Sequence, residues 1–376
     1  GLATNIPTHN LGEAIDAVIA VMDNPKITLG EVMQVLPAPD FPTGGLLLNT
    51  EEIRKAYETG RGRLLLRAKV EIEEANAGKK NLVITELPYQ VNKSALLEKI
   101  LKLSEEKKGI LSGISDIRDE SDRTGMRAVI ELKRDVDAQK VLAHLYRVSD
   151  LQITFGVNMV AIADGKPMQL SLLELIRRYI AHQKNVVTRR TQYELKQAQA
   201  REHILKGLMI AVDNLDAVIK LIRASKNPKE AREGLMNNFG LAEIQAQAIL
   251  DMRLQRLTNL EVLALKKEYE ELEKRISALK GILASEKKLM NVIKKELAEV
   301  RDAYADARRT QIVDSFDEIV IEEEKPIADD ATVLLTRGGF VKRMPPKSWM
   351  RPAITDEKAE PVRFAANVKT DEKILF

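Results

Sequence analysis

Cysteine is absent from this chain of 376 residues, and aromatic residues make up only 4% of it. Without thiols the chain forms neither disulfides nor thiolate metal sites, which fits a reducing cytoplasm. It also lacks any apolar run of about 18 residues, so we expect no membrane-spanning helix. The first residues show no basic segment followed by an apolar one, the pattern typical of a secretory signal peptide.

The balance of charge limits the class of partner. The chain has 59 Lys and Arg against 56 Asp and Glu, for a net charge of +3. Because the chain is no polycation, any role with nucleic acid must come from local patches. Abundant charge and few aromatic residues favour helical, extended architecture over a compact β-sandwich. The length is sufficient for two or three domains.

Two long helical patterns dominate the second half of the chain. Apolar residues recur at helical spacing from Leu172 to Ile222 and again from Leu260 to Val300, on a background of Lys and Glu. About 50 residues would form a helix of roughly 75 Å, which needs a partner helix. We therefore predict an antiparallel coiled coil over residues 166–310, with a small helical head at about 226–257.

Residues 1–165 have a different pattern. Alternating residues from Leu64 to Ile72, followed by a turn and by Asn81 to Thr85, predict a β-hairpin. Helical patterns such as Ala138 to Tyr146 separate this hairpin from further short strands. This region is predicted to be an α+β domain with a small, largely antiparallel sheet.

Residues 311–376 are predicted to be a linker followed by the start of an all-β domain. Gly338-Gly339 lies between two strand-like runs, Thr332 to Thr336 and Phe340 to Arg343, which indicates a hairpin. The chain starts without Met, and Phe376 falls within a strand-like pattern. We therefore expect it to be a fragment of a longer protein.

Eight stretches, taken in order, resemble the A subunit of bacterial type IIA DNA topoisomerases, that is, gyrase or topoisomerase IV. Any one of them would be weak, but the ordered set covers nearly the whole chain. The stretches are Ala3–Leu11, Pro39–Gly44, Tyr57–Gly62, Glu86–Lys93, Arg118–Asp122, Val187–Thr191, Gln245–Leu254 and Arg308–Thr310.

The resemblance implies a function as well as a fold. In that family a "tower" domain precedes a long coiled coil ending in a dimerisation head, the C-gate, and a β-pinwheel domain follows. These blocks correspond to residues 1–165, 166–310 and 311–376. The resemblance implies an ATP-dependent enzyme that cuts both strands of one duplex, passes another through and reseals the break. This chain would bind and bend the gate duplex and form the exit gate.

The resemblance also implies which parts are missing from this chain. The family's nucleophilic tyrosine belongs to a winged-helix domain that would precede Gly1, so none of the seven tyrosines present is expected to be catalytic. Mg²⁺ and ATP are expected on a partner B subunit, with no cofactor or metal on this chain, which alone should be inactive. The implied partners are duplex DNA, a second copy through the C-gate, and the B subunit in an A₂B₂ complex. The implied location is the bacterial cytoplasm, at the chromosome and with no membrane partner.

Two groups of residues are candidates for DNA contact. Asn5, His9 and Asn10 lie in a proline-containing loop and could bond phosphate oxygens, although capping and loop closure explain them equally. The second group is a row of cations at alternate positions of one predicted strand, about 6.6 Å apart, which suits a phosphate backbone. The alternative is a solvated strand face paired with Glu71 and Glu73. The cations are Arg61, Arg63, Arg67 and Lys69.

For several other cations, DNA contact and a structural role both remain open. Lys93 at a predicted helix start could contact phosphate or act in capping. Acids are interspersed among Arg118, Arg123 and Arg127, which predicts internal salt bridges. For Arg189-Arg190-Thr191 and Arg308-Arg309-Thr310, pairing with acids competes with a positive lining for a cavity that holds the transported duplex.

The predicted head carries an apolar cluster. About 30 residues cannot bury such a cluster alone, so we predict a self-complementary twofold interface, with packing onto the helix tips as the alternative. Isolated histidines at positions 144, 182 and 203 lack metal-site spacing. The cluster is Phe239, Leu241, Ile244, Ala248, Ile249, Met252 and Leu257.

Two sequence features bear on the subtype within this family and on a competing class of protein. Gyrase-type members of the family share a Gln-Arg-Arg-Gly-Gly-Lys-Gly box near the first pinwheel blade, and none follows Lys342-Arg343 here. This favours the topoisomerase IV type, which decatenates and relaxes DNA, with gyrase as the alternative. The competing class is a non-enzymatic coiled-coil dimer scaffold, which has no need of the cation row.

Overall fold

The computed structural model describes residues 1–75, 78–105, 109–252, 259–314, 330–345 and 361–369, with only the backbone for 259–261. The chain forms two compact units, each assembled from segments far apart in the sequence. The first comprises Gly1–Lys69, Glu86–Val91 and Gln152–Ser315, and the second comprises Val70–Thr85, Asn92–Leu151 and Phe316–Phe376. The division of the chain by function, with boundaries at 165 and 310, stays a prediction.

A four-stranded sheet with the order β10-β1-β2-β7 forms the base of the first unit. β1 (Leu46–Leu48) pairs in parallel with β10 (Gln311–Val313) and antiparallel with β2 (Arg61–Arg67). β2 in turn pairs antiparallel with β7 (Gln152–Asn158). The parallel pairing therefore brings the segment after the long helices back onto the sheet near the start of the unit.

Helices cover the apolar side of this sheet. They are α1 (Leu11–Asp23), α2 (Leu29–Val32) and α3 (Thr50–Thr59). Phe41 and Tyr57 are each 1% exposed in the core between these helices and the sheet. α3 approaches β2 closely because Gly62 has no side chain, since a Cβ there would lie 2.6 Å from the Cβ of Ala56.

The first unit continues into a long helix, α6 (Leu172–Asp213), which has 42 residues and a length of roughly 63 Å. A two-stranded hairpin, β8 (Val160–Ala163) with β9 (Lys166–Gln169), precedes it. A reciprocal capping box between Ser171 and Glu174 fixes where the helix begins.

The prediction of one helix to Ile222 was wrong at its end. α6 stops at Asn214, whose backbone N–H and side-chain Nδ2 both donate to the carbonyl of Ile210, at 3.2 and 2.9 Å. α7 (Leu215–Ala224) then starts as a separate helix. Asparagine satisfies the last turn locally, a role that apolar spacing does not reveal.

The second helical pattern, from Leu260 to Val300, also forms two helices, where the sequence predicted one. α10 (Asn259–Ala284) and α11 (Glu286–Tyr304) are separated by Ser285, which has an extended backbone and caps α11 by accepting from the N–H of Lys288 at 3.4 Å. Ion pairs fix the direction of α10 along α6. They join Arg201 to Glu268 at 2.8 Å and Glu194 to Arg275 at 3.3 Å, so the two helices are antiparallel.

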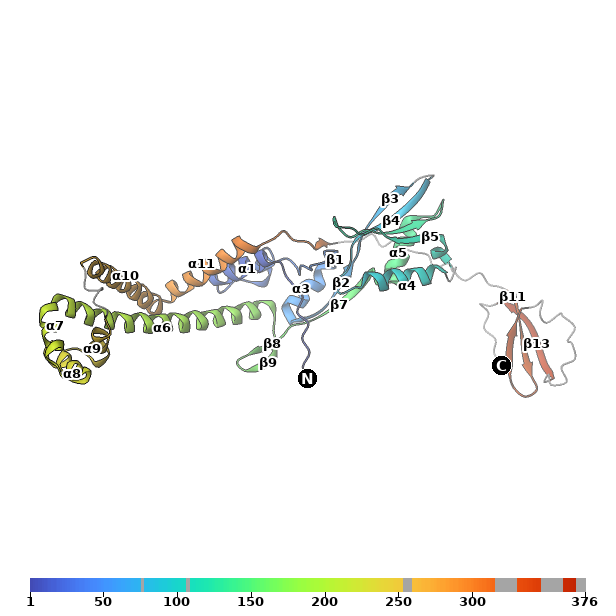
Figure 1. The fold of residues 1–376 in the computed structure, drawn as a ribbon. Helices are drawn as coiled ribbons and strands as arrows, with labels where there is room; N and C mark the ends of the chain where they lie inside the picture. Colours follow the sequence, from blue (N-terminus) through green and yellow to red (C-terminus); the bar gives the residue numbers. More distant parts are fainter. Residues whose placement is uncertain (76–77, 106–108, 253–258, 315–329, 346–360, 370–376) are drawn as a thin grey trace. The chain divides into compact units, whose positions relative to one another are not determined.

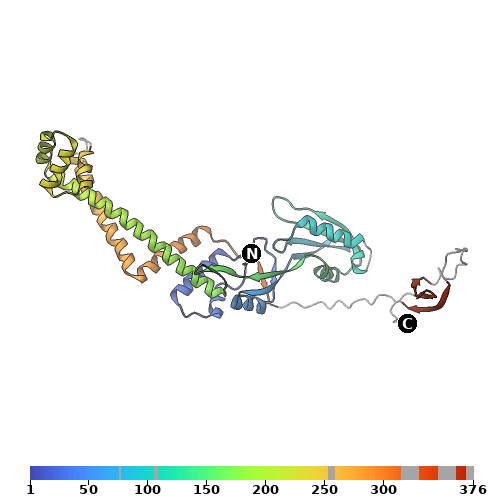
Figure 2. The same cartoon turned by 90° about the horizontal axis from the view of Figure 1, so that it is seen from below.

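Three short helices gather at one end of α6 (Figure 1). α7 is followed by α8 (Pro228–Phe239) and α9 (Glu243–Leu250), and Gly240 in a left-handed conformation separates the last two. α9 docks tightly on α6, because a Cβ at Gly207 would lie 2.6 Å from the Cβ of Gln245. Figure 2 shows the same cluster from below.

The second unit contains a sheet with the order β3-β4-β6-β5. The helix predicted over 138–146 is confirmed, and the predicted hairpin is confirmed in part, because its first strand begins only at Lys69. Leu82, Ile84 and Ile130 are fully buried in the core. The sheet is accompanied by two α-helices and a 3₁₀ helix, η2. The elements are β3 (Lys69–Ala75), β4 (Lys79–Glu86), α4 (Lys93–Glu105), η2 (Gly109–Gly113), β5 (Ile114–Asp119), β6 (Ala128–Leu132) and α5 (Ala138–Val148).

The last described residues form a separate three-stranded antiparallel sheet with the order β12-β11-β13. The predicted hairpin across Gly338-Gly339 is confirmed, and Gly339 has φ of +89°. The strands are β11 (Asp330–Thr336), β12 (Val341–Met344) and β13 (Val362–Lys369). Over the described residues the chain is mixed α and β, with several sheets and a long helix. Among the described residues, no helix is long and apolar enough to span a membrane.

Candidate nucleic-acid interface

The strand β2 separates its residues by chemistry onto two sides. Leu64 and Leu66 are 1% and 2% exposed and face the core. Arg61, Arg63 and Arg67 occupy the alternate positions, so they share the other side, and the first two are exposed. Three of the four predicted cations therefore lie in one row.

Lys69 is not part of this row. A single strand from Leu64 to Ile72 was the wrong prediction, because β2 ends at Arg67 and Lys69 begins β3 in another sheet. Its ammonium lies 3.7 Å from the carboxylate of Glu86. A change of sheet between neighbouring strands leaves alternation intact in the sequence, so the spacing alone did not expose the break.

The side of the sheet that carries these arginines continues onto β7, an extension that the sequence analysis missed. Arg63 pairs with Gly156 and Arg61 with Asn158, and paired residues of antiparallel strands point to the same side. Gly156 has no side chain and leaves Arg63 uncovered. The signal was present, because polar or small residues occupy positions 152, 154, 156 and 158 of β7 in alternation.

Asn5 joins the same face from the other edge of β7. Its backbone forms an isolated bridge with Asn158, with N···O distances of 2.8 and 2.9 Å in the two directions. Its side-chain Nδ2 donates to the carbonyl of Gly156 at 2.6 Å. Asn158 Oδ1 is buried and has no hydrogen-bond partner among the described residues. Asn5 therefore lies one strand away from Arg61 and Arg63.

The arginines of this face differ in whether another side chain bonds to the guanidinium group. Arg67 Nε donates to Gln152 Oε1 at 2.7 Å. In the part of the chain that the structure describes, no acidic side chain forms an ion pair with Arg61 or Arg63. We define Asn5, Arg61, Arg63 and Arg67 as the arginine face. Exposed guanidinium groups about 6.6 Å apart along a strand are donors suited to phosphate oxygens.

His9 and Asn10 face inward. His9 Nε2 and Tyr57 Oη form a hydrogen bond of 2.8 Å, and the two rings stack. Burial lowers the pKa of His9 to about 4, and the Arg308 guanidinium lowers it further against a backbone hydrogen bond to Pro7. Asn10 is buried and caps α1, because its Oδ1 accepts from the N–H of Glu13 at 3.2 Å. This is the capping alternative, and a phosphate contact at either residue stays a prediction.

The motif Arg308-Arg309-Thr310 forms a junction within the first unit. Arg308 donates to both carboxylate oxygens of Glu13 and to the carbonyls of Ala38 and Pro39. Burial disfavours the ionised form of Asp40, but hydrogen bonds from the backbone N–H groups of Thr310 and Arg309 outweigh it and lower the pKa of Asp40. The motif thus holds β10 in place, which is the pairing alternative.

Three cations of the second unit that the sequence singled out, Lys93, Arg118 and Arg127, are also paired, whereas no ion pair to Arg123 is found among the described residues. Lys93 Nζ lies 2.6 Å from Asp119 Oδ2, and hydrogen bonds from Lys93 and Ser121 lower the pKa of Asp119 to about 2. Arg127 donates to both carboxylate oxygens of Glu73 at 2.8 and 2.7 Å. The prediction of internal salt bridges is confirmed for Arg127, and also for Arg118, which pairs with Glu131.

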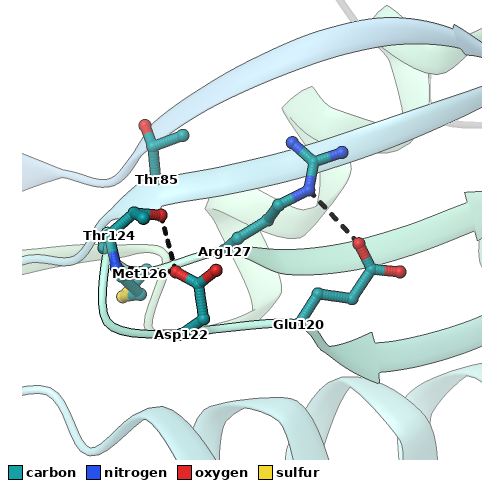
Figure 3. Close-up of a pocket in the computed structure, with 7 residues that line it drawn as sticks. Thr85, Glu120, Asp122, Thr124, Met126 and Arg127 are labelled. Atoms are coloured by element: carbon teal, nitrogen blue, oxygen red, sulfur yellow. Dashed lines mark hydrogen bonds and ion pairs between the residues drawn. The ribbon is translucent and has the colours of Figure 1, made fainter.

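A hollow of about 220 Å³ lies beside the turn between β5 and β6 (Figure 3). Its polar side chains satisfy one another. Asp122 accepts from the N–H and the hydroxyl of Thr124 at 2.7 and 2.6 Å, and Arg127 Nε donates to Glu120 at 3.2 Å. Among the described residues no group of three or more His, Asp or Glu could hold a metal ion. These pairings leave the hollow poorly suited to a charged ligand.

The predicted interface cluster of the head is only partly accessible. Leu241 and Ile249 are 4% and 3% exposed, and they pack in a core that includes Leu205 and Leu208 of α6. These two side chains are therefore buried within one chain by packing onto α6, which is the alternative of packing onto the helix tips, and the twofold interface stays a prediction. Ile244 is 64% exposed. Phe239, Ala248 and Met252 are partly buried at the edge of that core, and Leu257 lies outside the described residues.

Comparison with known proteins identifies a family. The family model for the A subunit of DNA gyrase/topoisomerase IV matches residues 1–298. The DNA gyrase A subunit of Halalkalibacterium halodurans is 51% identical over 92% of this chain. The DNA gyrase A subunit of Clostridium acetobutylicum is 49% identical over 92% of the chain.

Relatives of both subtypes occur at similar identity. The DNA topoisomerase 4 A subunit of Bacillus subtilis is 46% identical over 93% of this chain. The chain spans only about two fifths of the relatives' own length, 41% for the two gyrase proteins and 43% for the Bacillus protein.

Proposed function

This chain belongs to the family of DNA gyrase/topoisomerase IV A subunits, and from this premise we propose that it binds and bends the gate duplex and forms the exit gate of a type IIA topoisomerase. The observation that carries the proposal is the arginine face. Two exposed guanidinium groups without acidic partners among the described residues have a large unfulfilled capacity to bind phosphate. In a topoisomerase family, the natural source of those phosphates is the DNA backbone.

The arginine face is suited to position DNA without reading its sequence. Phosphate contacts fix the orientation of a duplex and carry no base information. The buried side of β2 is anchored by Leu64 and Leu66, so the strand presents its arginines from a rigid support. We propose that this rigidity lets the sheet impose a bend on the gate duplex.

We further propose that α6, α10 and α11 form the coiled-coil arm and that the α7–α9 head forms the C-gate with a second copy. Exposed Ile244 supports a self-complementary contact, because an isolated large apolar side chain on a small head gains from burial. The buried Leu241 and Ile249 would stiffen the head from within. The resulting interface should be moderate in area, because it must separate once in each cycle.

The chemistry of strand cleavage is assigned to other parts of the assembly. We propose that this stretch supplies no nucleophile and is inactive alone, with Mg²⁺ and ATP held by a B subunit in an A₂B₂ complex in the cytoplasm. Tyr57, on the helix that packs against the arginine-bearing strand, supports this assignment. Its hydroxyl is buried and hydrogen-bonded to His9, so it is not available to attack a phosphate.

Among subtypes we propose the topoisomerase IV type. The support is the sequence after Lys342-Arg343, which lacks the Gln-Arg-Arg-Gly-Gly-Lys-Gly box. The second candidate is a gyrase A subunit, which the identity of the gyrase relatives favours. A non-enzymatic dimer scaffold is the third, and it would have no use for the arginine face.

Two assays on the full-length protein test these proposals. Filter binding of a duplex at low salt should detect an affinity that falls steeply as salt rises. No affinity at low salt would exclude the topoisomerase proposal and leave the scaffold. With its B subunit and ATP, the protein should decatenate linked circles, whereas ATP-driven negative supercoiling of relaxed circles would establish gyrase instead.

A further inference from the structure

Gly156 is a glycine in the middle of a strand. The described strands contain two glycines, Gly62 in β2 and Gly156 in β7. A glycine inside a strand weakens it, because it loses more conformational freedom on folding than any other residue and has no side chain to pack. Such a glycine often marks a bulge, a barrel corner, or a place where another group approaches the backbone closely.

The internal reasons for a glycine do not apply to Gly156. Its φ lies outside the left-handed region that favours glycine, and a Cβ added there would have no described atom within 4 Å apart from its chain neighbours. The register between β2 and β7 runs without a shift, so there is no bulge, and the sheet is open with β7 at its edge. Gly62 differs, because a Cβ there would collide with Ala56.

The strand on either side of Gly156 is well anchored. Phe155 and Val157 are each 5% exposed and face the core. The ring of Phe155 packs edge-on against Phe41, with the ring centroids 5.3 Å apart. The glycine therefore does not serve to loosen the strand, which leaves close approach by a group from outside this chain as its explanation.

Hydrogen-bond donors surround the open space at Gly156. Arg63 lies opposite on β2 and forms no ion pair with a described acid. Asn158 exchanges backbone hydrogen bonds with Asn5, so its N–H points away from β2, and alternation along the strand gives the N–H of Gly156 the same direction. That N–H has no partner among the described residues. Asn5 Nδ2 donates one hydrogen to the carbonyl of Gly156 at 2.6 Å and has a second to offer.

We propose that Gly156 is itself a DNA contact, where one phosphate of a duplex lies directly against the backbone of β7. The inference rests on the proposed function. Arg63 would bind the phosphate from the neighbouring strand, and the N–H groups of Gly156 and Asn5 would bind it from the edge, since backbone and amide N–H groups are common phosphate donors. Cβ atoms of paired residues lie about 4.5 to 5.5 Å apart, so a side chain at position 156 would fill the space that the phosphate needs.

This role predicts opposite effects on stability and on binding. Replacing a glycine whose φ suits any residue removes freedom from the unfolded chain, and valine favours strands, so Gly156→Val should not destabilise the fold. The same change holds the duplex away from β7. A glycine needed for the fold would behave differently, because its replacement would lower stability and binding together.

The test uses the full-length protein, with Gly156→Val and the smaller change Gly156→Ala. The urea midpoint of Gly156→Val should be at least that of the unaltered protein. Its duplex affinity should fall by about tenfold in roughly 0.1 M salt, as for one lost phosphate contact, and Gly156→Ala should fall less. The matched control is Gly30→Ala, an exposed glycine of α2 with equally open surroundings, which should bind as before. Unchanged affinity in Gly156→Val, or a parallel loss of stability, would overturn the inference.

A double-mutant cycle tests whether Gly156 and Arg63 bind the same phosphate. Gly156→Val should weaken binding much less in the Arg63→Gln background than in the unaltered protein, because the shared contact is already lost. Additive effects would contradict a shared phosphate. If the unaltered protein binds no duplex, the proposed function fails; if it binds and the Gly156 variants bind equally well, only this inference fails.

Discussion

Two sets of arginines on strands of this protein have opposite surroundings. Arg61 and Arg63 on β2 lie on an open sheet face with no acidic partner among the described residues. Arg118 on β5 and Arg127 beside β6 are each held by carboxylates of the same unit. The residue type is the same in both sets, so the neighbouring acids separate a binding surface from a structural network.

The two sets of arginines differ in the free energy that they must spend to bind phosphate. A guanidinium that is already bonded to a carboxylate must break that bond before it meets phosphate, whereas an unpaired one loses only water. Paired cations should therefore govern stability and unpaired ones should govern DNA affinity.

The largest effect is expected at Arg308, a paired cation that is well enclosed. Its side chain is 19% exposed and bonds Glu13 and two carbonyls. Arg308→Gln leaves the Glu13 charge without its partner and should lower the free energy of unfolding by about 3 kcal/mol in urea titration. The control is Arg309→Gln, where the side chain is 57% exposed, and its effect should be much smaller. An equal loss of unfolding free energy in the two variants would contradict the role of burial.

A second effect concerns His9, which the structure places in the same network. Its pKa is about 4 in the folded chain, below the ordinary value of 6.5, so protonation favours the unfolded state. Stability should be complete above pH 6.5 and fall as the pH drops toward 4, by at most about 3 kcal/mol. His9→Gln should lack this dependence. A His9 that titrates near 6.5 by NMR would instead support an accessible residue poised for phosphate.

The smallest effect is expected at the exposed pair of Lys93 and Asp119. The pKa of Asp119 is about 2, so the stability from this pair is present above about pH 4 and is lost as the pH falls toward 2. NMR of the carboxyl carbon should show the pKa of Asp119 rising toward its ordinary value in Lys93→Gln. The variant should bind duplex DNA as before, and weaker binding would place Lys93 among the DNA contacts after all.

The sequence predicted the elements of this fold better than their ends. Apolar spacing located α6 and the return helices, because burial on one side imposes a period of 3.6. It did not locate the breaks at Asn214 and Ser285, because both residues act through hydrogen bonds to the backbone. Nor did it show that Lys69 lies in a different sheet from Arg67, since the alternation of residues is the same in β2 and β3.

The candidate site was predictable only in part. The row of Arg61, Arg63 and Arg67 follows directly from alternation on one strand. Its extension over Gly156 depends on the register between β2 and β7, which are far apart in the sequence, so it leaves no local signal. The burial of Leu241 and Ile249 likewise depends on α6 reaching the head, which the size of the head alone could not indicate.

The salt dependence of duplex binding by the full-length protein tests the central claim most directly. In Arg61→Gln/Arg63→Gln, the slope of log affinity against log salt should decrease by about 1.8, as expected for two lost phosphate contacts. In Arg118→Gln/Arg127→Gln, which removes the same charge from paired positions, the slope should be unchanged. An unchanged slope in the first variant, or the same decrease in both, would contradict the account.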